Sequence, residues 1–278
     1  MKTFKLSNEV LIPQVGFGTY KLTEGEECYK STKNALAIGY RHIDTAAVYE
    51  NEVSVGRAIV DSGIDRKEIF LTTKVWNSDR GYENTMKAFE ESLKRLNVDY
   101  VDLYLVHWPA NAQQFSNSKE LNASTWKAME EIYKSGKAKA IGVSNFLVHH
   151  LNDLFESCTV KPMVNQIEFH PGYIQKETVA FCQQNAILVQ AWSPLGRGRV
   201  LNHPVLEKIA QKHESSTSAV CLQFALQQGI CVLPKSATKE RIVANLATNI
   251  ELTSEEIEQI RSMEEVGFSG LNPDTVTF

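Results

Sequence analysis

The stretch IFLTTKVW, residues 69–76, is a run of apolar, β-branched and aromatic residues with one lysine, Lys74, set near its carboxyl end. Runs of this kind are typical of parallel strands that are buried on both faces. Burying an unpaired ammonium group is costly, so Lys74 requires either water or a charged partner. The run therefore predicts a buried strand that ends on a chemically distinctive residue.

Similar runs recur along the chain, and most of them end on polar or aromatic residues. We expect eight strands, near Val15–Thr19, His42–Asp44, Ile69–Val75, Val101–His107, Ala138–Val143, Val164–Glu168, Ile187–Trp192 and Ile230–Leu233. The residues at their ends are Asp44, Lys74, His107, Ser144, Asn145, Gln166, Glu168, Trp192, Lys235 and Ser236. In an eight-stranded barrel, the loops that follow the strands all open on one face. The pattern therefore predicts one site distributed around a ring.

Segments with apolar residues at helical spacing separate these strands. They cover Glu24–Ile38, Glu52–Ser62, Tyr82–Leu96, Thr125–Lys134 and Val148–Phe155. Strands that alternate with helices pair in parallel through right-handed crossovers. The expected fold class is therefore α/β, as a (β/α)8 TIM barrel.

Four segments fall outside the repeat. FKL and VLI, on either side of Ser7-Asn8, predict an N-terminal β-hairpin, and Pro204–Lys212 and Ser254–Met263 predict two extra helices. We expect Ala110–Ala123 to be a polar loop that borders a pocket, and Gly267–Phe278 to lie over one end of the barrel. No proline-rich or low-complexity linker divides the chain, so a single domain over residues 1–278 is expected.

The composition excludes several classes of function. The 278 residues are 43% hydrophobic and carry a formal net charge of −4, which gives no electrostatic basis for binding nucleic acid or an anionic membrane. We find neither a signal peptide nor the ~20 consecutive apolar residues of a membrane span. The five scattered cysteines form no CxxC pair, which favours buried thiols in a reducing cytoplasm.

The first three polar strand ends suggest acid–base chemistry. Asp44 ends the strand before that of Lys74 and could keep the lysine charged, and Tyr49 follows in the same loop. A neighbouring ammonium favours phenolate, so we expect the Tyr49 pKa to fall from roughly 10 toward neutrality. A neutral His107 could donate a hydrogen bond to a substrate oxygen. Taken singly, the lysine could instead extend into water and the histidine could be a core residue.

At these positions the chain resembles the aldo-keto reductases. The resemblance rests on GYRHIDTAAVYENE, TTKVW, DLYLVHWP, IGVSNF, NQIEFHP, AWSPLG and LPKSATKERIVANL, which occur in the family's usual order from Val10 to the tail. It points to bacterial members that reduce glyoxal, methylglyoxal or 2,5-diketo-D-gluconate. It implies a catalytic tetrad of Asp44, Tyr49, Lys74 and His107, with Tyr49 as the general acid in reduction and the general base in oxidation.

The resemblance also implies a nicotinamide cofactor. Trp192 would stack on the nicotinamide, whose carboxamide would bind Ser144, Asn145 and Gln166. The first strand would border the cofactor through Gly16, Gly18 and Thr19, and the loop backbone of Ser193, Leu195 and Gly196 would approach the pyrophosphate. The adenosine half would be held by Lys235, Ser236, Arg241 and Asn245. Lysine and arginine near a ribose favour a 2′-phosphate, so we expect NADPH rather than NADH.

Substrate contacts are expected from aromatic residues that follow the rim segments, namely Tyr20, Trp76 and Trp108, together with His107. Core packing is the alternative for each aromatic ring, and Trp126 is assigned to the core. In the family a variable C-terminal loop covers the substrate. The tail here is short, so we expect a fairly open pocket for small carbonyls.

The resulting hypothesis is a cytoplasmic, monomeric, NADPH-dependent reductase of small aldehydes, dicarbonyls, keto sugars or keto acids. One alternative is a nucleotide-binding regulatory barrel with slow turnover, and another is an aldolase that uses Lys74 as a Schiff base. Rossmann and P-loop motifs are incomplete at GFG, GRG and PKS. His149-His150 and His213 lack metal-like spacing with carboxylates or thiols, so no metal is expected.

Overall fold

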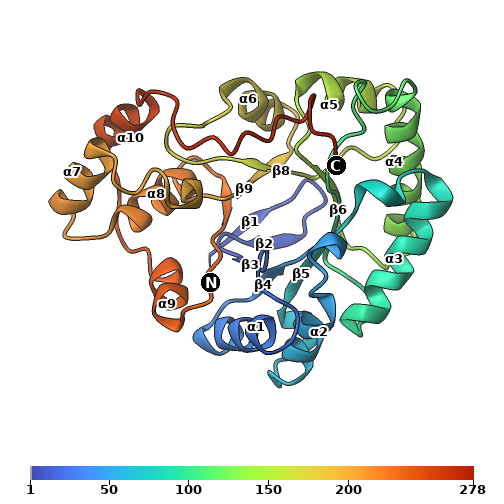
Figure 1. Cartoon of the computed structure of the whole chain (residues 1–278), viewed down its shortest axis with the longest axis horizontal. Helices are drawn as coiled ribbons and strands as arrows, with labels where there is room; N and C mark the ends of the chain where they lie inside the picture. Colours follow the sequence, from blue (N-terminus) through green and yellow to red (C-terminus); the bar gives the residue numbers. More distant parts are fainter. Residues whose placement is uncertain (1) are drawn as a thin grey trace.

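Eight parallel strands form the centre of the computed structural model, which describes residues 2–278 (Figure 1). They are β3 (Phe17–Gly18), β4 (His42–Asp44), β5 (Phe70–Val75), β6 (Leu103–Val106), β7 (Ile141–Ser144), β8 (Val164–Glu168), β9 (Leu188–Trp192) and β10 (Cys231–Leu233). Each strand pairs with the next in sequence order. A parallel bridge between Val15 and Val232 joins the first segment to the last, so the sheet closes on itself. The predicted (β/α)8 barrel is confirmed.

The first strand is shorter than predicted, because its few residues divide their main-chain hydrogen bonds between β4 and the segment around β10. Phe17 and Gly18 pair with β4, whereas the Gly16 N–H donates to the Val232 carbonyl at 2.8 Å and the Gly18 N–H donates to the Pro234 carbonyl at 3.1 Å. An added Cβ on Gly16 would lie 2.6 Å from the His42 ring. Glycine at this position therefore allows the barrel seam to close over a buried imidazole.

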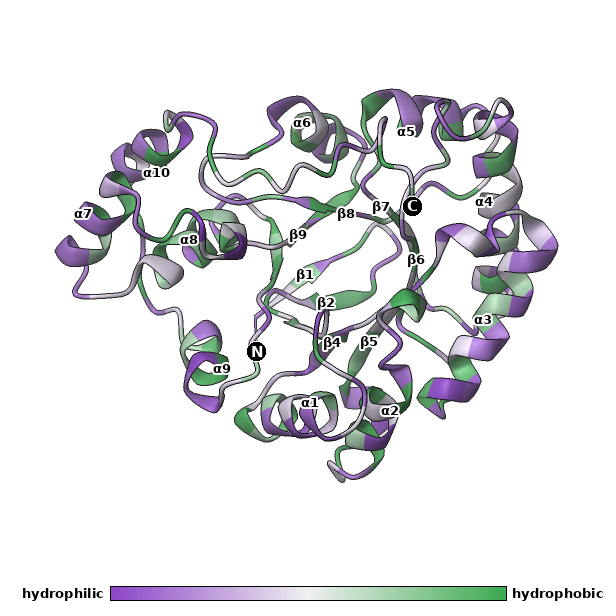
Figure 2. Ribbon diagram, viewed as in Figure 1, coloured by the Kyte–Doolittle hydropathy of each residue, from purple (hydrophilic) through white to green (hydrophobic). Residues whose placement is uncertain are grey.

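Ten helices surround the barrel in the described part of the chain. They are α1 (Glu26–Ile38), α2 (Glu52–Val60), α3 (Tyr82–Leu96), α4 (Ser118–Lys134), α5 (Val148–Phe155), α6 (Lys176–Gln184), α7 (Pro204–Lys212), α8 (Thr217–Leu226), α9 (Lys239–Leu246) and α10 (Ser254–Arg261). Figure 2 shows mostly apolar strands inside and helices with one apolar and one polar side. All six residues of β5 are buried, as expected for a strand covered on both faces.

The sequence pattern located some helices and missed others. The predicted extra helices correspond to α7 and α10, which pack together. Helices α6 and α8 were not predicted. Helix α8, TSAVCLQFAL, has six buried residues and no clear polar stripe, so helical periodicity does not reveal it. The predicted polar loop 110–123 is also shorter than expected, because α4 begins at Ser118.

The two ends of the barrel are covered by the two ends of the chain. The predicted hairpin forms between β1 (Thr3–Lys5) and β2 (Leu11–Pro13), and Asn8 donates to the Lys139 carbonyl, just before β7, at 2.9 Å. The tail crosses the opposite end, where Ser269 donates to the Glu168 carboxylate through Oγ at 2.7 Å. Figure 1 shows this segment passing α6 and α5 toward the C-terminus, as predicted.

Between residues 2 and 278, none of the helices combines the length and the apolar character needed to cross a bilayer. All five cysteines are free, and four of them are buried. Trp126 is 1% exposed and donates to the Val160 carbonyl at 2.9 Å, which confirms its assignment to the core.

Candidate active site

Lys74 lies at the centre of the candidate site and is completely buried. Its Nζ donates to Asp44 Oδ1 at 2.7 Å and to the Thr45 carbonyl at 2.8 Å, and lies 3.5 Å from the Tyr49 hydroxyl. Adjacent parallel strands β4 and β5 supply the acid and the amine. Burial lowers the pKa of Lys74, and the ion pair with Asp44 opposes that effect. The buried ammonium therefore has the charged partner that the sequence required.

Tyr49 reaches this pair from a short 3-10 helix, Ala47–Tyr49, directly after β4. Its ring centroid lies 5.1 Å from that of Tyr20 and 5.6 Å from that of His107. The Lys74 Nζ lies 5.0 Å from the centre of the Tyr49 ring. The structure thus brings all four residues of the predicted tetrad together.

The expected pKa shift of Tyr49 was wrong in direction. Burial, together with the negative charge of Asp44 and the phenol of Tyr20, raises the pKa of Tyr49 well above its ordinary value of 10.0. The nearby ammonium does not reverse this shift, because its short ion pair at 2.7 Å is to Asp44 and the phenol lies farther away at 3.5 Å. Tyr49 is therefore a neutral phenol at neutral pH and holds a proton that it can donate.

His107 follows β6, and its ring meets that of Tyr49 edge-on with 5.6 Å between the centroids. Burial and the charge of Lys74 hold the pKa of His107 well below its ordinary value of 6.5. Its Nδ1 atom is buried and has no hydrogen-bond partner among residues 2–278. The ring is therefore neutral and carries a single N–H, which can be offered to a ligand oxygen.

Three of the residues predicted for the carboxamide lie in one hydrogen-bonded group with the tetrad. Gln166 Nε2 donates to Asp44 Oδ2 at 2.8 Å and to Gln190 Oε1 at 2.6 Å. Ser144 Oγ donates to the Gln166 carbonyl at 2.7 Å. Within the described residues, Gln166 Oε1 accepts no side-chain or main-chain hydrogen bond, so an acceptor is left for an incoming amide.

Asn145 joins the predicted stacking residue to the tetrad. It accepts from Trp192 Nε1 at 2.8 Å and donates to the His107 carbonyl at 2.9 Å and to Ser144 Oγ at 3.1 Å. Both of its amide hydrogens are thus used within the protein. Only the Oδ1 atom of Asn145 can accept a further hydrogen bond, from a ligand.

The loop after β9 has the irregular backbone expected of a close ligand approach. Ser193, Gly196, Arg197 and Gly198 all have positive φ, between 49° and 87°. The Arg197 guanidinium lies 5.7 Å from the centre of the Trp192 ring, a contact that the sequence did not suggest. On the first strand, Thr19 N–H and Oγ1 both donate to the Asp44 carbonyl at 3.0 Å. Gly18 and Thr19 therefore border the site beside Asp44.

The residues predicted for the adenosine half follow β10 and enter α9. Lys235 and Arg241 are exposed, whereas Ser236 and Asn245 are buried. Neither cation takes part in a salt bridge with a carboxylate in residues 2–278. The two charges are available to an anionic ligand, and Ser236 Oγ accepts from the Thr238 N–H at 3.1 Å to shape the turn between them.

Aromatic rings extend from His107 toward the surface. The Trp76 ring lies 5.1 Å from the His107 ring and stacks on Phe278 at 5.5 Å, while Trp108 meets Phe278 edge-on at 5.2 Å. Tyr20 is 46% exposed on the opposite side of Tyr49. The short tail therefore reaches the predicted substrate wall, and Phe278 is a residue that sequence reasoning missed. The available signal was an aromatic residue in a segment predicted to lie over one end of the barrel.

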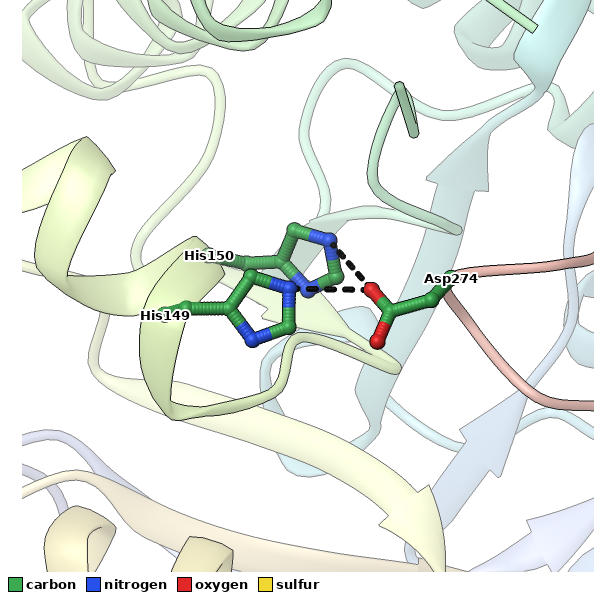
Figure 3. A group of neighbouring side chains, drawn as sticks. All are labelled: His149, His150 and Asp274. Carbon is green, nitrogen blue, oxygen red and sulfur yellow. Dashed lines mark hydrogen bonds and ion pairs between the residues drawn. The ribbon is translucent and has the colours of Figure 1, made fainter. Parts of the chain in front are cut away.

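One group of possible metal ligands occurs away from this site. His149 and His150, on the first turn of α5, converge on the tail residue Asp274 (Figure 3). The two Nε2 atoms lie 2.9 and 3.3 Å from Asp274 Oδ1. The main-chain N–H of Leu147 donates to His150 Nδ1 at 3.2 Å, which places the ring proton on Nε2. In this tautomer His150 Nε2 has no lone pair for a metal, and His149 Nε2 is hydrogen-bonded to Asp274 Oδ1 at 2.9 Å.

Comparisons with known proteins agree with the fold and identify the family. The sequence matches the aldo/keto reductase family over residues 14–265. It is 47% identical to the glyoxal reductase of Bacillus subtilis (strain 168) over 277 residues, covering 99% of this chain and 98% of the relative.

Solved structures give the same result. An aldo-keto reductase, MGS-M4, from a Medee basin deep-sea metagenome library superposes with a TM-score of 0.93 at 42% identity, covering 99% of this chain and all of its own. A Gox0644 mutant in complex with NADPH has a TM-score of 0.92 at 38% identity, covering 100% of this chain and 99% of its own.

Proposed function

The chain belongs to the aldo/keto reductase family, and on that basis we propose that it reduces small aldehydes and dicarbonyls to alcohols with NADPH. The observation that carries the proposal is the buried Asp44–Lys74 ion pair beside a protonated Tyr49 and a neutral His107. Keto sugars and keto acids remain further candidate substrates. The sequence match to glyoxal reductase supports testing dicarbonyls first.

The reaction requires one hydride and one proton. A bound NADPH supplies the hydride to the carbonyl carbon, which leaves NADP+ and an oxygen that must gain a proton. Tyr49 is proposed as the donor, because its burial keeps the phenol protonated at neutral pH. Loss of that proton creates a partly buried phenolate, and the Lys74 ammonium 3.5 Å away stabilises it. In the oxidation direction the same phenolate accepts the proton.

Asp44 and His107 are proposed to support this transfer in different ways. Asp44 accepts from Lys74 on one oxygen and from Gln166 on the other, so it fixes the ammonium in place. A neutral His107 donates one hydrogen bond to the carbonyl oxygen and holds it near the Tyr49 hydroxyl. An imidazolium would compete as a proton donor, and burial next to Lys74 suppresses that form.

The chain's residues fit a nicotinamide cofactor. We propose that the carboxamide N–H binds the free acceptor of Gln166, with Ser144 and Asn145 nearby, and that Trp192 stacks on the nicotinamide ring. Ser193, Leu195 and Gly196 would receive the pyrophosphate, and Gly18 and Thr19 would border it from β3. Lys235 and Arg241 would bind the 2′-phosphate, with Ser236 and Asn245 at the adenosine. The planar guanidinium group of arginine can donate two parallel hydrogen bonds to a phosphate. NADPH carries a 2′-phosphate and NADH does not, so NADPH is favoured.

Substrate contacts are proposed for Tyr20, Trp76 and Trp108, with Phe278 added from the structure. These rings lie near Tyr49 and His107 and would form an aromatic wall against a small carbonyl compound. A reducing, cytoplasmic setting and a monomeric state are part of the same proposal. The free cysteines support a reducing setting.

Steady-state kinetics test the proposal. NADPH and NADH are each assayed against glyoxal, methylglyoxal, simple aldehydes and keto sugars. We expect turnover with NADPH and dicarbonyls or aldehydes, and a much weaker response with NADH. NADPH binding without turnover of any carbonyl would instead favour the regulatory, nucleotide-binding alternative. Borohydride trapping of a substrate on Lys74 would favour an aldolase.

A further inference from the structure

The tail that reaches the aromatic wall is fastened to α5 by a single carboxylate. His149 Nε2 lies 2.9 Å from Asp274 Oδ1, and His150 Nε2 lies 3.3 Å from the same oxygen (Figure 3). We propose that Asp274 is a positioning residue for the substrate pocket, which holds Phe278 against Trp76 and Trp108 through this contact. The contact of Asp274 with His149 and His150 is called the tail pin below.

The histidines of the pin favour a hydrogen-bond acceptor on the tail. His150 is only 7% exposed, and the Leu147 N–H occupies its Nδ1, so its Nε2 must carry hydrogen. Burial is the largest factor that lowers the pKa of His150 to about 4, and His149 adds to it, so this ring is a neutral donor at neutral pH. The hydrogen bond of the pin joins His149 Nε2 and Asp274 Oδ1 at 2.9 Å, and His150 Nε2 faces the same oxygen at 3.3 Å.

A rigid turn connects Asp274 to Phe278. Asn272 Oδ1 accepts from the Asp274 N–H at 2.9 Å, and the Asn272 carbonyl accepts from the N–H groups of Thr275 and Val276 at 3.0 Å. Buried Asn111 lies in the same segment after β6 as Trp108, and it donates to the carbonyls of Pro273 and Val276. A change at Asp274 is therefore transmitted through a few fixed residues to Phe278.

The far end of the turn completes the pocket wall. Asn77 Nδ2 donates to the main-chain oxygen of Phe278 at 3.0 Å, and the Phe278 ring contacts both tryptophans. Trp76 in turn contacts His107. The pin should therefore affect how substrate is held, whereas the side chains proposed to hold the cofactor, at the ends of β7, β8 and β9 and on α9, make no hydrogen bond to Asp274 in the described residues.

The effect on catalysis rests on the proposed function, whereas the effect on the tail does not. The experiment compares full-length wild type with Asp274→Ala, Asp274→Asn and Thr277→Ala. Thr277 is an exposed tail residue outside the pin and serves as the matched control. Hydrogen exchange of tail amides is measured first, without substrate. KM and kcat for an aromatic aldehyde and for glyoxal follow, with the Kd of NADPH.

We expect Asp274→Ala to speed tail exchange by about tenfold and to raise KM for the aromatic aldehyde by about five- to tenfold, as loss of a charge-assisted contact predicts. The kcat and the NADPH Kd should stay within about twofold, because their groups do not touch the pin. Asp274→Asn, which keeps an acceptor oxygen, should recover part of both effects. Thr277→Ala should resemble wild type.

A double variant separates positioning from general destabilisation. If Asp274 acts through Phe278, then Asp274→Ala combined with Phe278→Ala should give the KM of Phe278→Ala alone. Additive effects, or an unchanged KM in Asp274→Ala, would overturn the proposal. Unchanged tail exchange would overturn the pin itself. If wild type reduces no carbonyl compound, the proposed function fails, and the exchange data still decide whether the pin holds the tail.

Discussion

The Nζ atom of Lys74 lies 3.5 Å from the phenolic oxygen of Tyr49, inside a barrel where Lys74 has no exposure to solvent. The same ammonium makes a shorter contact of 2.7 Å with Asp44. The ion pair keeps the lysine charged, and the longer contact leaves the phenol protonated until a substrate oxygen removes its proton. Lys74 therefore stabilises the phenolate that forms when Tyr49 gives up its proton, and it does not deprotonate Tyr49 beforehand.

Removing the ammonium should damage both stability and activity. In Lys74→Met the Asp44 carboxylate is left buried at 3% exposure without its cation. Breaking one side of a buried ion pair costs about 3–5 kcal/mol, so urea denaturation should show a loss of that order. Lys74→Met combined with Asp44→Asn should recover much of the stability and none of the turnover. Equal stability of Lys74→Met and wild type would contradict the ion-pair assignment.

Arg241 should discriminate between the two nicotinamide cofactors. If it binds the 2′-phosphate, Arg241→Ala loses a charge-assisted contact, which should weaken NADPH by about tenfold or more and change NADH little. Isothermal titration with each cofactor measures the difference. Lys208→Ala, an exposed lysine on α7, is the control for a general loss of positive charge. Equal losses for both cofactors would remove the assignment.

The residues at the strand ends could be predicted from the sequence, because strands that follow one another in the chain are neighbours in the barrel. Asp44, Lys74 and His107 each follow a short apolar run, and parallel strands bring such positions to one face. Tyr49 could be assigned because it lies in the loop directly after Asp44. The resemblance to a family supplied the roles, which geometry alone does not give.

Other features could not be read in the same way, because they depend on contacts between distant segments. The Tyr49 pKa was wrong because nearest-neighbour reasoning considered the cation and ignored burial and Asp44. Asp274 lies 125 residues from His149, so spacing gave no sign of their contact. Phe278 belongs to a segment without periodicity, whose position depends on contacts with distant residues, among them Asn77 and Asn111.

Buried histidines should make the protein sensitive to mild acid. Burial lowers the pKa values of His42 and His150 from the ordinary 6.5 to about 4. The unfolded chain takes up protons below pH 6.5 and the folded chain does not, so this contribution to stability is complete above 6.5 and is lost as pH falls toward about 4. Thermal unfolding from pH 7.5 to 4.0 should show Tm falling across that window.

His42→Asn removes one of the three buried histidines whose pKa values are lowered, the others being His107 and His150. Its own Tm should be lower at neutral pH, because the hydrogen bond between His42 Nε2 and Thr72 at 3.2 Å is disturbed. Its Tm should nevertheless fall less steeply with acid than that of wild type. Parallel profiles for the two proteins would show that His42 is not responsible for the acid sensitivity.

Divalent metal ions should have no specific effect at the tail pin. Because His150 Nε2 carries the proton, zinc would have to displace the Leu147 hydrogen bond in order to bind there. Adding micromolar zinc or EDTA should leave both Tm and NADPH turnover unchanged. A zinc-dependent rise in Tm that disappears in Asp274→Ala would show that the three side chains form a metal site after all.

The central claim is that Tyr49 delivers the proton, and single-turnover reduction of glyoxal by the NADPH-loaded enzyme tests it most directly. The loss of NADPH absorbance is followed in wild type and in Tyr49→Phe, with NADPH affinity measured in parallel. We expect the variant to bind NADPH nearly as well and to react about 10²–10⁴-fold more slowly, as loss of acid–base catalysis predicts. A rate for Tyr49→Phe within a few-fold of wild type would contradict the account.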